Sequence, residues 1–218
     1  MYPIRNQLDK DDVEEGDYFP NEFTTERLRF VGPLRDYYQI SEFHDFIMNG
    51  KSAEKMAKYN YYQSNEGLDK TIENWDYIND KWSNCEAAYY GIELLDEETM
   101  DDFEYSFIGW GDLEFDWELG RAELGVSIHP EFWGRGFSGE RAEALVDLAF
   151  WYDGINIVDV FPSPENKNSV SAVEKYVSKM GGERVGTVKN KYYIEGEGVK
   201  DAVVFQITEK QFEDNLPL

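Results

Sequence analysis

A glycine-rich turn in the middle of the chain has the composition of an anion-binding site. An apolar strand pattern over residues 121–129 runs into a loop with Gly134, Gly136 and Gly139, and an amphipathic stretch follows. Such a loop directs several backbone N–H groups to one point at the positive end of a helix dipole. Glycine permits positive φ and the close approach of a phosphate. The turn therefore predicts a phosphate site, to which Arg135 adds a cationic contact.

The residues around these glycines differ from two common phosphate-binding loops. No Gly-Lys-Ser/Thr follows, as it does in the Walker loop, and the turn does not match the dinucleotide GxGxxG with its acidic residue on the next strand. Taken alone, a tight turn that needs glycine only for its geometry explains the spacing about as well. The elements on either side must decide between the two.

The composition predicts one domain with a substantial core. The chain has 218 residues, of which 41% are hydrophobic and 16% aromatic. It has no apolar run near the roughly 18 residues that span a bilayer, and its N-terminus does not resemble a signal peptide. The lone Cys85 cannot form an internal disulfide, and two histidines with one cysteine form no zinc spacing. We expect a cytoplasmic protein without a metal.

The net charge of −24 excludes some partners. An acidic surface repels nucleic-acid phosphates and anionic lipid heads, so neither nucleic acid nor a membrane is expected as a partner. Two interpretations remain for the acidity. One is a solvated surface adapted to high salt, as in halophilic cytoplasm, and the other is a field that attracts cationic substrates.

Hydrophobic periodicity predicts a mixed α/β domain. We expect an acidic N-terminal arm over residues 1–23, one domain over 24–212 and a tail over 213–218. Ser171 and Glu174 form a candidate capping box, and an acidic loop is expected over 96–102. Strands are expected from residue 28 and over 87–95, 105–115, 121–129, 155–161, 184–194 and 201–208, with helices over 36–50, 52–63, 69–82, 138–152 and 169–180.

The turn resembles motif A of the GCN5-related N-acetyltransferase (GNAT) superfamily, whose loop reads Gln/Arg-x-x-Gly-x-Gly/Ala. Here Trp133 stands in the Gln/Arg place and Ser138 in the Gly/Ala place. A Trp-Gly-Lys-Gly-Tyr turn is familiar in the RimJ/RimL-like branch, which acetylates ribosomal-protein N-termini. Other segments resemble that branch in the same order: 25–29, 107–109, Asn166 with Ser169, 179–181 and 201–208.

The resemblance implies a GNAT fold with acetyl-CoA as co-substrate. Its central sheet is mixed and mostly antiparallel and is flanked by helices. Its fourth and fifth strands, here about 122–129 and 155–161, are parallel and splay apart around the pantetheine arm. The implied pyrophosphate site is the set of backbone N–H groups of residues 134–139, which are Gly134, Arg135, Gly136, Phe137, Ser138 and Gly139.

Further contacts follow from the same resemblance. A backbone N–H near Ser127 or Ile128 would polarise the thioester carbonyl. Asn166 and Asn168 would bond the pantetheine amides, although helix capping and turn formation explain these asparagines equally well.

Direct attack by an amine requires a base, because alkyl amines are mostly protonated at neutral pH, with a pKa of about 10.4 for lysine. Glu123 is the first candidate base, since it shares a strand face with Ser127. Asp112 and Glu114 are further candidates. Ser127 is a candidate for proton transfer and Tyr176 for the general acid. The alternatives are a solvated or salt-bridged carboxylate for Glu123 and core packing for Tyr176.

The resemblance thus predicts an acetyl-CoA-dependent N-acetyltransferase. The acceptor would be a primary amine, either a protein N-terminus or a small cationic molecule, and a homodimer is common for such folds. The alternative is a non-catalytic protein of the same fold that binds acyl-CoA as a sensor. His129 before Pro130 is expected to be a loop or strand-end residue. The tryptophans expected to fill the core or line the acceptor groove are Trp75, Trp82 and Trp110.

Overall fold

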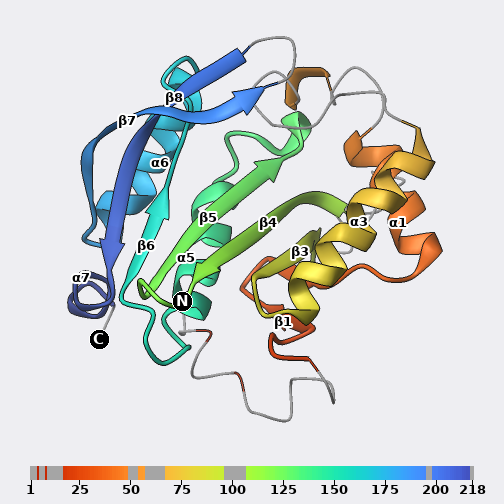
Figure 1. The fold of residues 1–218 in the computed structure, drawn as a ribbon, viewed down its shortest axis with the longest axis horizontal. Helices are drawn as coiled ribbons and strands as arrows, with labels where there is room; N and C mark the ends of the chain where they lie inside the picture. The colour runs from red at the N-terminus through yellow and green to blue at the C-terminus, as the bar shows by residue number, and fades with distance from the viewer. Residues whose placement is uncertain are drawn as a thin grey trace.

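The computed structural model describes residues 4, 8, 17–48, 54–56, 67–95, 107–194 and 198–216. These residues build an eight-stranded sheet in the order β1-β2-β3-β4-β5-β6-β8-β7, with helices packed against it (Figure 1). No helix among them is long and apolar enough to cross a membrane.

The described elements follow the predicted order, with a short strand added at the start and a short helix at the end. The strands are β1 (Glu22–Thr24), β2 (Leu28–Val31), β3 (Ala87–Leu94), β4 (Phe107–Asp116), β5 (Arg121–Ile128), β6 (Ile157–Val160), β7 (Glu183–Ile194) and β8 (Gly198–Thr208). The helices are α1 (Tyr37–Phe43), α3 (Leu68–Ser83), α5 (Phe137–Ala149), α6 (Lys167–Lys179) and α7 (Glu209–Asp214), with a π-helical turn η3 (His44–Met48) and a 3-10 turn η4 (Pro130–Phe132).

Strands β1 to β5 pair antiparallel with one another in chain order. Asp112 of β4 lies opposite Gly125 of β5, and Glu114 lies opposite Glu123. Successive side chains of a strand point to opposite faces of the sheet. One face of the sheet therefore carries Trp110, Asp112 and Glu114 from β4 together with Glu123, Gly125 and Ser127 from β5.

Strands β5 and β6 are the predicted parallel pair, and they bond only at one end. Residues 121–123 pair with 157–159, and the paired register stops there. The bonded end is tied by the buried Asp159, whose carboxylate accepts hydrogen bonds from Arg121 Nε and Gln206 Nε2, each at 2.8 Å. Beyond it β5 continues to Ile128 without a partner in β6, which leaves a gap in the sheet. The predicted splayed pair is confirmed.

Different helices cover the two faces of the sheet beside this gap. On one face, Lys81 Nζ of α3 donates to Glu114 Oε1 at 2.9 Å. On the other face, a Cβ at Gly111 would meet Leu145 of α5 at 2.7 Å and the Arg141 side chain at 3.3 Å. In Figure 1, α1 and α3 lie together beside the β3 side of the sheet, and α5 and α6 lie behind the strands.

The described end of the N-terminal arm is docked on the core. Phe19 stacks on Phe115 with ring centroids 5.2 Å apart, and Phe23 stacks on Phe30 at 4.4 Å. Aromatic stacking and the pairing of β1 with β2 explain this docking. Apart from Ile4 and Leu8, the earlier part of the arm lies outside the described residues, as does the expected acidic loop over 96–102.

Several helix boundaries differ from the prediction. Asn166, rather than Ser171, caps α6, because its Oδ1 accepts a hydrogen bond from Ser169 N at 3.1 Å and the helix begins at Lys167. The helix expected over 36–50 changes to the π-helical turn η3 after Phe43. Of the one expected over 52–63, the structure describes residues 54–56, which are helical, and α7 extends into the expected tail.

Candidate functional site

A cleft of about 1120 Å³ occupies the gap between β5 and β6. One end lies at the glycine-rich turn and the start of α6, and the other lies between α3 and the exposed face of β4. We call these the turn end and the carboxylate end. Of the residues predicted for the site, those that line the cleft are Glu123, Ser127, Ile128, Gly134, Gly136, Phe137, Ser138, Asn166, Asn168 and Tyr176; Arg135 and Gly139 do not line it.

The turn end offers a run of free backbone donors. None of the N–H groups of residues 134–138 donates to an acceptor within the described part of the chain. Gly134 and Gly136 hold φ of 77° and 85°, a region that favours glycine, and Gly136 is the N-cap of α5. The N–H of Gly139 donates to Gly136 O at 3.1 Å, so the free set ends at Ser138. Consecutive free N–H groups at a helix start bind anions such as phosphate.

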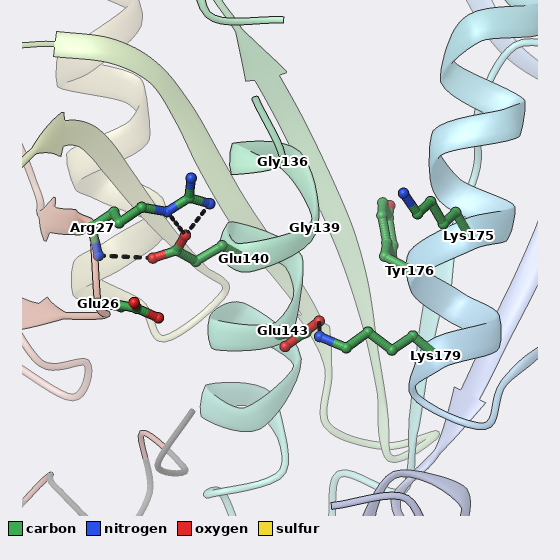
Figure 2. Close-up of a pocket in the computed structure, with 9 residues that line it drawn as sticks. All are labelled: Glu26, Arg27, Gly136, Gly139, Glu140, Glu143, Lys175, Tyr176 and Lys179. Carbon is green, nitrogen blue, oxygen red and sulfur yellow. Dashed lines mark hydrogen bonds and ion pairs between the residues drawn. The ribbon is translucent and has the colours of Figure 1, made fainter. Parts of the chain in front are cut away.

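The first turn of α5 is clamped to the start of β2 (Figure 2). Glu140, whose side chain is 5% exposed, accepts hydrogen bonds from Thr25 Oγ1 at 2.6 Å, Arg27 N at 2.9 Å and Arg27 Nε at 2.7 Å. Arg27 Nη1 donates to the Arg135 carbonyl at 3.1 Å, and its guanidinium lies 4.5 Å from the Phe137 ring centroid. Arg27 therefore fixes both the helix start and the turn itself.

Figure 2 also shows a smaller pocket of about 420 Å³ between α5 and α6. Lys175 and Lys179 extend into it from α6, and Lys179 Nζ pairs with Glu143 at 2.5 Å. Gly139 faces this pocket rather than the main cleft, and a Cβ there would meet Tyr176 Cβ at 3.9 Å. The pocket adjoins the turn at Gly136, and its lining contains three acidic and three basic residues: Glu26, Glu140 and Glu143 with Arg27, Lys175 and Lys179.

The middle of the cleft is lined by the end of β5. His129 N donates to Ile108 O of β4, and N–H directions alternate along a strand. The N–H of Ile128 therefore points away from β4, into the gap, whereas that of Ser127 points toward β4. The Ile128 carbonyl accepts a hydrogen bond from Trp133 Nε1 at 2.6 Å. Of the two donors predicted for a carbonyl oxygen, the geometry favours Ile128.

Two carboxylates at the carboxylate end are already hydrogen-bonded. Glu123 accepts from Lys191 Nζ at 2.6 Å and from the Tyr192 hydroxyl at 2.8 Å. Glu114 accepts from Lys81 and from the Tyr89 hydroxyl, at 2.9 and 2.8 Å. Burial acts to raise the pKa of Glu114, but these hydrogen bonds outweigh it and hold that pKa below its ordinary value.

Asp112 has a different environment from these two. It is half-buried, lines the cleft, and accepts no hydrogen bond or ion pair from the described residues. Burial and then the charge of Glu114 raise the pKa of Asp112 to about 7, against the opposing effect of Arg141. A carboxyl group with this pKa can take up or release a proton near neutral pH.

Tyr176 and Arg141 bring unsatisfied polar groups close to the cleft. The Tyr176 hydroxyl and the Nε and Nη1 of Arg141 are buried and have no hydrogen-bond partner among the described residues. Burial raises the pKa of Tyr176 to about 12, against the effect of Arg141, and it lowers the pKa of Arg141 to about 10. At neutral pH the tyrosine is therefore a proton donor and the arginine is charged.

The remaining predicted residues divide into two groups. Asn166 and Asn168 line the cleft, as does Ser127, which is buried beside Trp110. His129 lies outside it, and its Nδ1 accepts a hydrogen bond from Glu131 N at 3.4 Å; burial lowers its pKa. Of the tryptophans expected in the core or the groove, Trp82 is fully buried, and the two that line the carboxylate end are Trp75 and Trp110.

Sequence reasoning missed two contributions to this site. The first is the contact of Thr25 and Arg27 with Glu140, which joins residues more than a hundred positions apart. The only signal was the resemblance of residues 25–29 to an opening strand. The second is the buried Arg141, because a charged residue in an amphipathic helix is expected on its solvated face.

Comparison with known proteins identifies the family of this chain. The family described as "Acetyltransferase (GNAT) domain" matches residues 34–176. A curated relative, the uncharacterized N-acetyltransferase p20 of Bacillus licheniformis, is 26% identical over 97 residues, which cover 44% of this chain and 52% of the relative. The matched part of the chain thus spans about half the length of that curated relative.

Solved structures share the fold. A putative ribosomal-protein-serine acetyltransferase from Vibrio cholerae superposes with a TM-score of 0.70 at 18% identity, covering 88% of this chain and 99% of the other. A spermidine N-acetyltransferase from Vibrio cholerae, solved with CoA and spermine, superposes with a TM-score of 0.65 at 17% identity, covering 87% and 99%.

Proposed function

Because the chain belongs to the GNAT acetyltransferase family, we propose that it transfers the acetyl group of acetyl-CoA to a primary amine. The observation that carries this proposal is the cleft itself. It joins the free N–H groups of residues 134–138 at one end to ionisable carboxylates at the other. An anion-binding end and a proton-accepting end are what direct transfer from an acyl-CoA to an amine requires.

The turn end would hold the acetyl donor. The N–H groups of residues 134–138 would bind the pyrophosphate, with Arg135 as a further cation near it. Asn166 and Asn168 at the start of α6 lie where pantetheine amides would pass through the gap. The Ile128 N–H would stabilise the oxyanion that develops on the thioester carbonyl.

The carboxylate end would receive the amine. An ammonium ion is attracted both to carboxylates and to the faces of aromatic rings, and this end contains Trp75, Tyr89 and Trp110. Glu123 and Ser127 are the groups proposed from the sequence for proton removal from the amine. Tyr176 is proposed to protonate the departing thiolate, because its pKa keeps the hydroxyl protonated.

The acceptor is proposed to be a protein N-terminus or a small cationic amine. Structural relatives include proteins named for ribosomal-protein acetylation and for spermidine acetylation. Both classes present a primary amine that is cationic at neutral pH. The Asp112 carboxylate and the aromatic rings at the carboxylate end suit either class.

A second candidate function is a non-catalytic acyl-CoA sensor. The specific observation in its favour is that both oxygens of Glu123, the first candidate base, are occupied by Lys191 and Tyr192. In that case the turn end would bind acyl-CoA while the carboxylate end served only to hold the sheet together.

The test is CoA release from acetyl-CoA with a panel of amines and N-terminal peptides, at low and high KCl. We expect thiol release that depends on the amine. Acetyl-CoA binding without turnover of any amine would favour the sensor. Absence of acetyl-CoA binding at both salt levels would contradict both candidate functions.

The acidity, location and assembly of the protein are also proposals. We propose a cytoplasmic enzyme, dimeric as is common for such folds, whose net charge of −24 adapts it to high salt. The other explanation, attraction of a cationic acceptor, predicts that salt raises the KM for the amine. The salt adaptation predicts that salt stabilises the fold.

A further inference from the structure

We propose that Asp112 accepts the proton of the incoming amine, and that Gly125 is present to leave room for its carboxylate. This inference rests on the proposed acetyl transfer. It adds the identity of the group that activates the acceptor, and it replaces Glu123 in that role.

The hydrogen bonds at the carboxylate end single out Asp112. Glu114 and Glu123 each accept two hydrogen bonds, one of them from a lysine ammonium group. The oxygens that accept these hydrogen bonds are therefore already occupied by donors of the protein itself. Asp112 lies next to this pair on the same face, opposite Gly125, and accepts no hydrogen bond or ion pair from the described residues.

The contact with Gly125 fixes where this carboxylate lies. A Cβ at Gly125 would be 2.2 Å from Asp112 Oδ2 and 2.4 Å from Oδ1, so the carboxylate occupies the space above the glycine. Any side chain at position 125 would displace it. The carboxylate thus lies over β5 between Glu123 and Ser127.

This position suits proton transfer to a site near Ile128. Ile128 lies three residues beyond Gly125, a span of about 10 Å at roughly 3.3 Å per residue. That length accommodates the thioester carbonyl at the Ile128 N–H, the attacking nitrogen, and one water molecule that bridges to Asp112. A general base acts efficiently through one such water.

The surrounding charges keep the basicity of Asp112 high. Glu114 of β4 and Glu123 of β5 favour its protonated form, whereas Arg141 of α5 and Lys81 of α3 favour its ionised form. Burial adds to the first effect, and the pKa of about 7 follows. Relative to an ordinary aspartate, proton transfer from an alkylammonium ion becomes about a thousandfold more favourable.

Acetyl transfer removes two protons from the ammonium group of the acceptor. The ammonium form of the acceptor gives one proton to the Asp112 carboxylate, which leaves a neutral amine. Its lone pair forms the new C–N bond to the thioester carbonyl carbon, and the C–S bond breaks. The CoA thiolate takes the hydroxyl proton of Tyr176. The second nitrogen proton passes to water, and a proton from water restores the Tyr176 hydroxyl. Asp112 then releases its proton to solvent and is ready for the next amine.

The experiment compares three variants: Asp112→Asn, Glu123→Gln and, as a matched control, Asp80→Asn on the exposed side of α3. For each we would measure acetyl-CoA affinity by calorimetry, kcat/KM for the amine from pH 5 to pH 9, and thermal stability at pH 4 and pH 8. We expect Asp112→Asn to bind acetyl-CoA as wild type does, while kcat/KM falls by about 10² to 10⁴. The wild-type loss of activity below about pH 7 should disappear.

Thermal stability provides a readout that is independent of turnover. A carboxyl whose pKa is raised in the folded state stabilises the fold at low pH, and that contribution is lost as pH rises from about 4 to about 7. Asp112→Asn should therefore gain stability relative to wild type on going from pH 4 to pH 8, and Asp80→Asn should not.

Two results would overturn the proposal. Asp112→Asn that retains wild-type turnover and its acidic limb would exclude Asp112 as the base, and so would loss of that limb in Glu123→Gln alone. Both results can be obtained only if the wild-type protein acetylates an amine, because each compares the activity of a variant with that of the wild type. Wild-type protein that binds acetyl-CoA but acetylates no amine would contradict the proposed function itself, and this inference with it.

Discussion

The two ends of the cleft are built from different parts of the polypeptide. The turn end is made of backbone: the free N–H groups of residues 134–138, with glycine at the two positions of positive φ. The carboxylate end is made of side chains from β3, β4, β5, β7 and α3, whose roles depend on their hydrogen-bond partners. Donor binding therefore depends on local conformation, and proton transfer depends on long-range contacts.

This difference explains why the two ends tolerate change differently. A backbone site is insensitive to most side chains but fails when the turn cannot adopt its dihedral angles. A site made of side chains changes its chemistry with each partner, because the pKa of a carboxyl group follows its neighbours. Asp112 and Glu114, two residues apart on one strand face, have pKa values shifted in opposite directions for this reason.

The largest effect that tests the comparison, after that of Asp112→Asn, is expected for Tyr176→Phe. Loss of the hydroxyl should leave acetyl-CoA binding near wild type and lower kcat by about 10² or more, because the thiolate loses its proton donor. Tyr152→Phe, which removes a hydroxyl from another buried tyrosine, is the control. Equal kcat values for the two variants would show that Tyr176 only packs.

The clamp on the turn gives the next effect. Arg27→Ala should lower the free energy of unfolding by about 2–3 kcal/mol, because Glu140 is left buried with fewer hydrogen bonds. Acetyl-CoA affinity should fall as well, since the Arg135 carbonyl loses its partner. The control is Lys70→Ala, which breaks an exposed pair with Glu73 and should cost no more than about 1 kcal/mol. Chemical denaturation of both variants measures the difference.

Gly136→Val tests the backbone character of the turn end alone. At a φ of 85°, a β-branched residue is strained by about 1–3 kcal/mol, so the turn should change shape and bind acetyl-CoA about tenfold more weakly. Space does not limit the substitution, since the nearest atom to an added Cβ is Arg27 Nη2 at 3.5 Å. Unchanged acetyl-CoA affinity in a folded variant, measured by calorimetry, would contradict the proposal that the pyrophosphate binds at this turn.

The smallest effect concerns the surface rather than the cleft. With a net charge of −24, the melting temperature should rise by several degrees from low to molar KCl as self-repulsion is screened. A melting temperature that does not change, together with a KM for the amine that rises with KCl, would instead assign the acidity to attraction of the acceptor.

The local parts of this account could be predicted from the sequence. The glycine spacing and the amphipathic pattern of α5 locate the turn because both are properties of neighbouring residues. The partners of Glu123 could not be predicted, since Lys191 and Tyr192 are 68 and 69 positions away and meet it only through the β6-β8-β7 arrangement. For the same reason, Glu123 is the first candidate base when only the sequence is considered. Asp112 differs from Glu114 and Glu123 because Lys81 and Lys191 bind those two carboxylates and not that of Asp112.

A crystal structure with bound CoA would test the central claim most directly. The account predicts the pyrophosphate on the N–H groups of residues 134–138, the sulfur in the β5–β6 gap near Ile128, and Asp112 open to the acceptor side. A pyrophosphate bound instead between Lys175 and Lys179, with the β5–β6 gap closed, would contradict it.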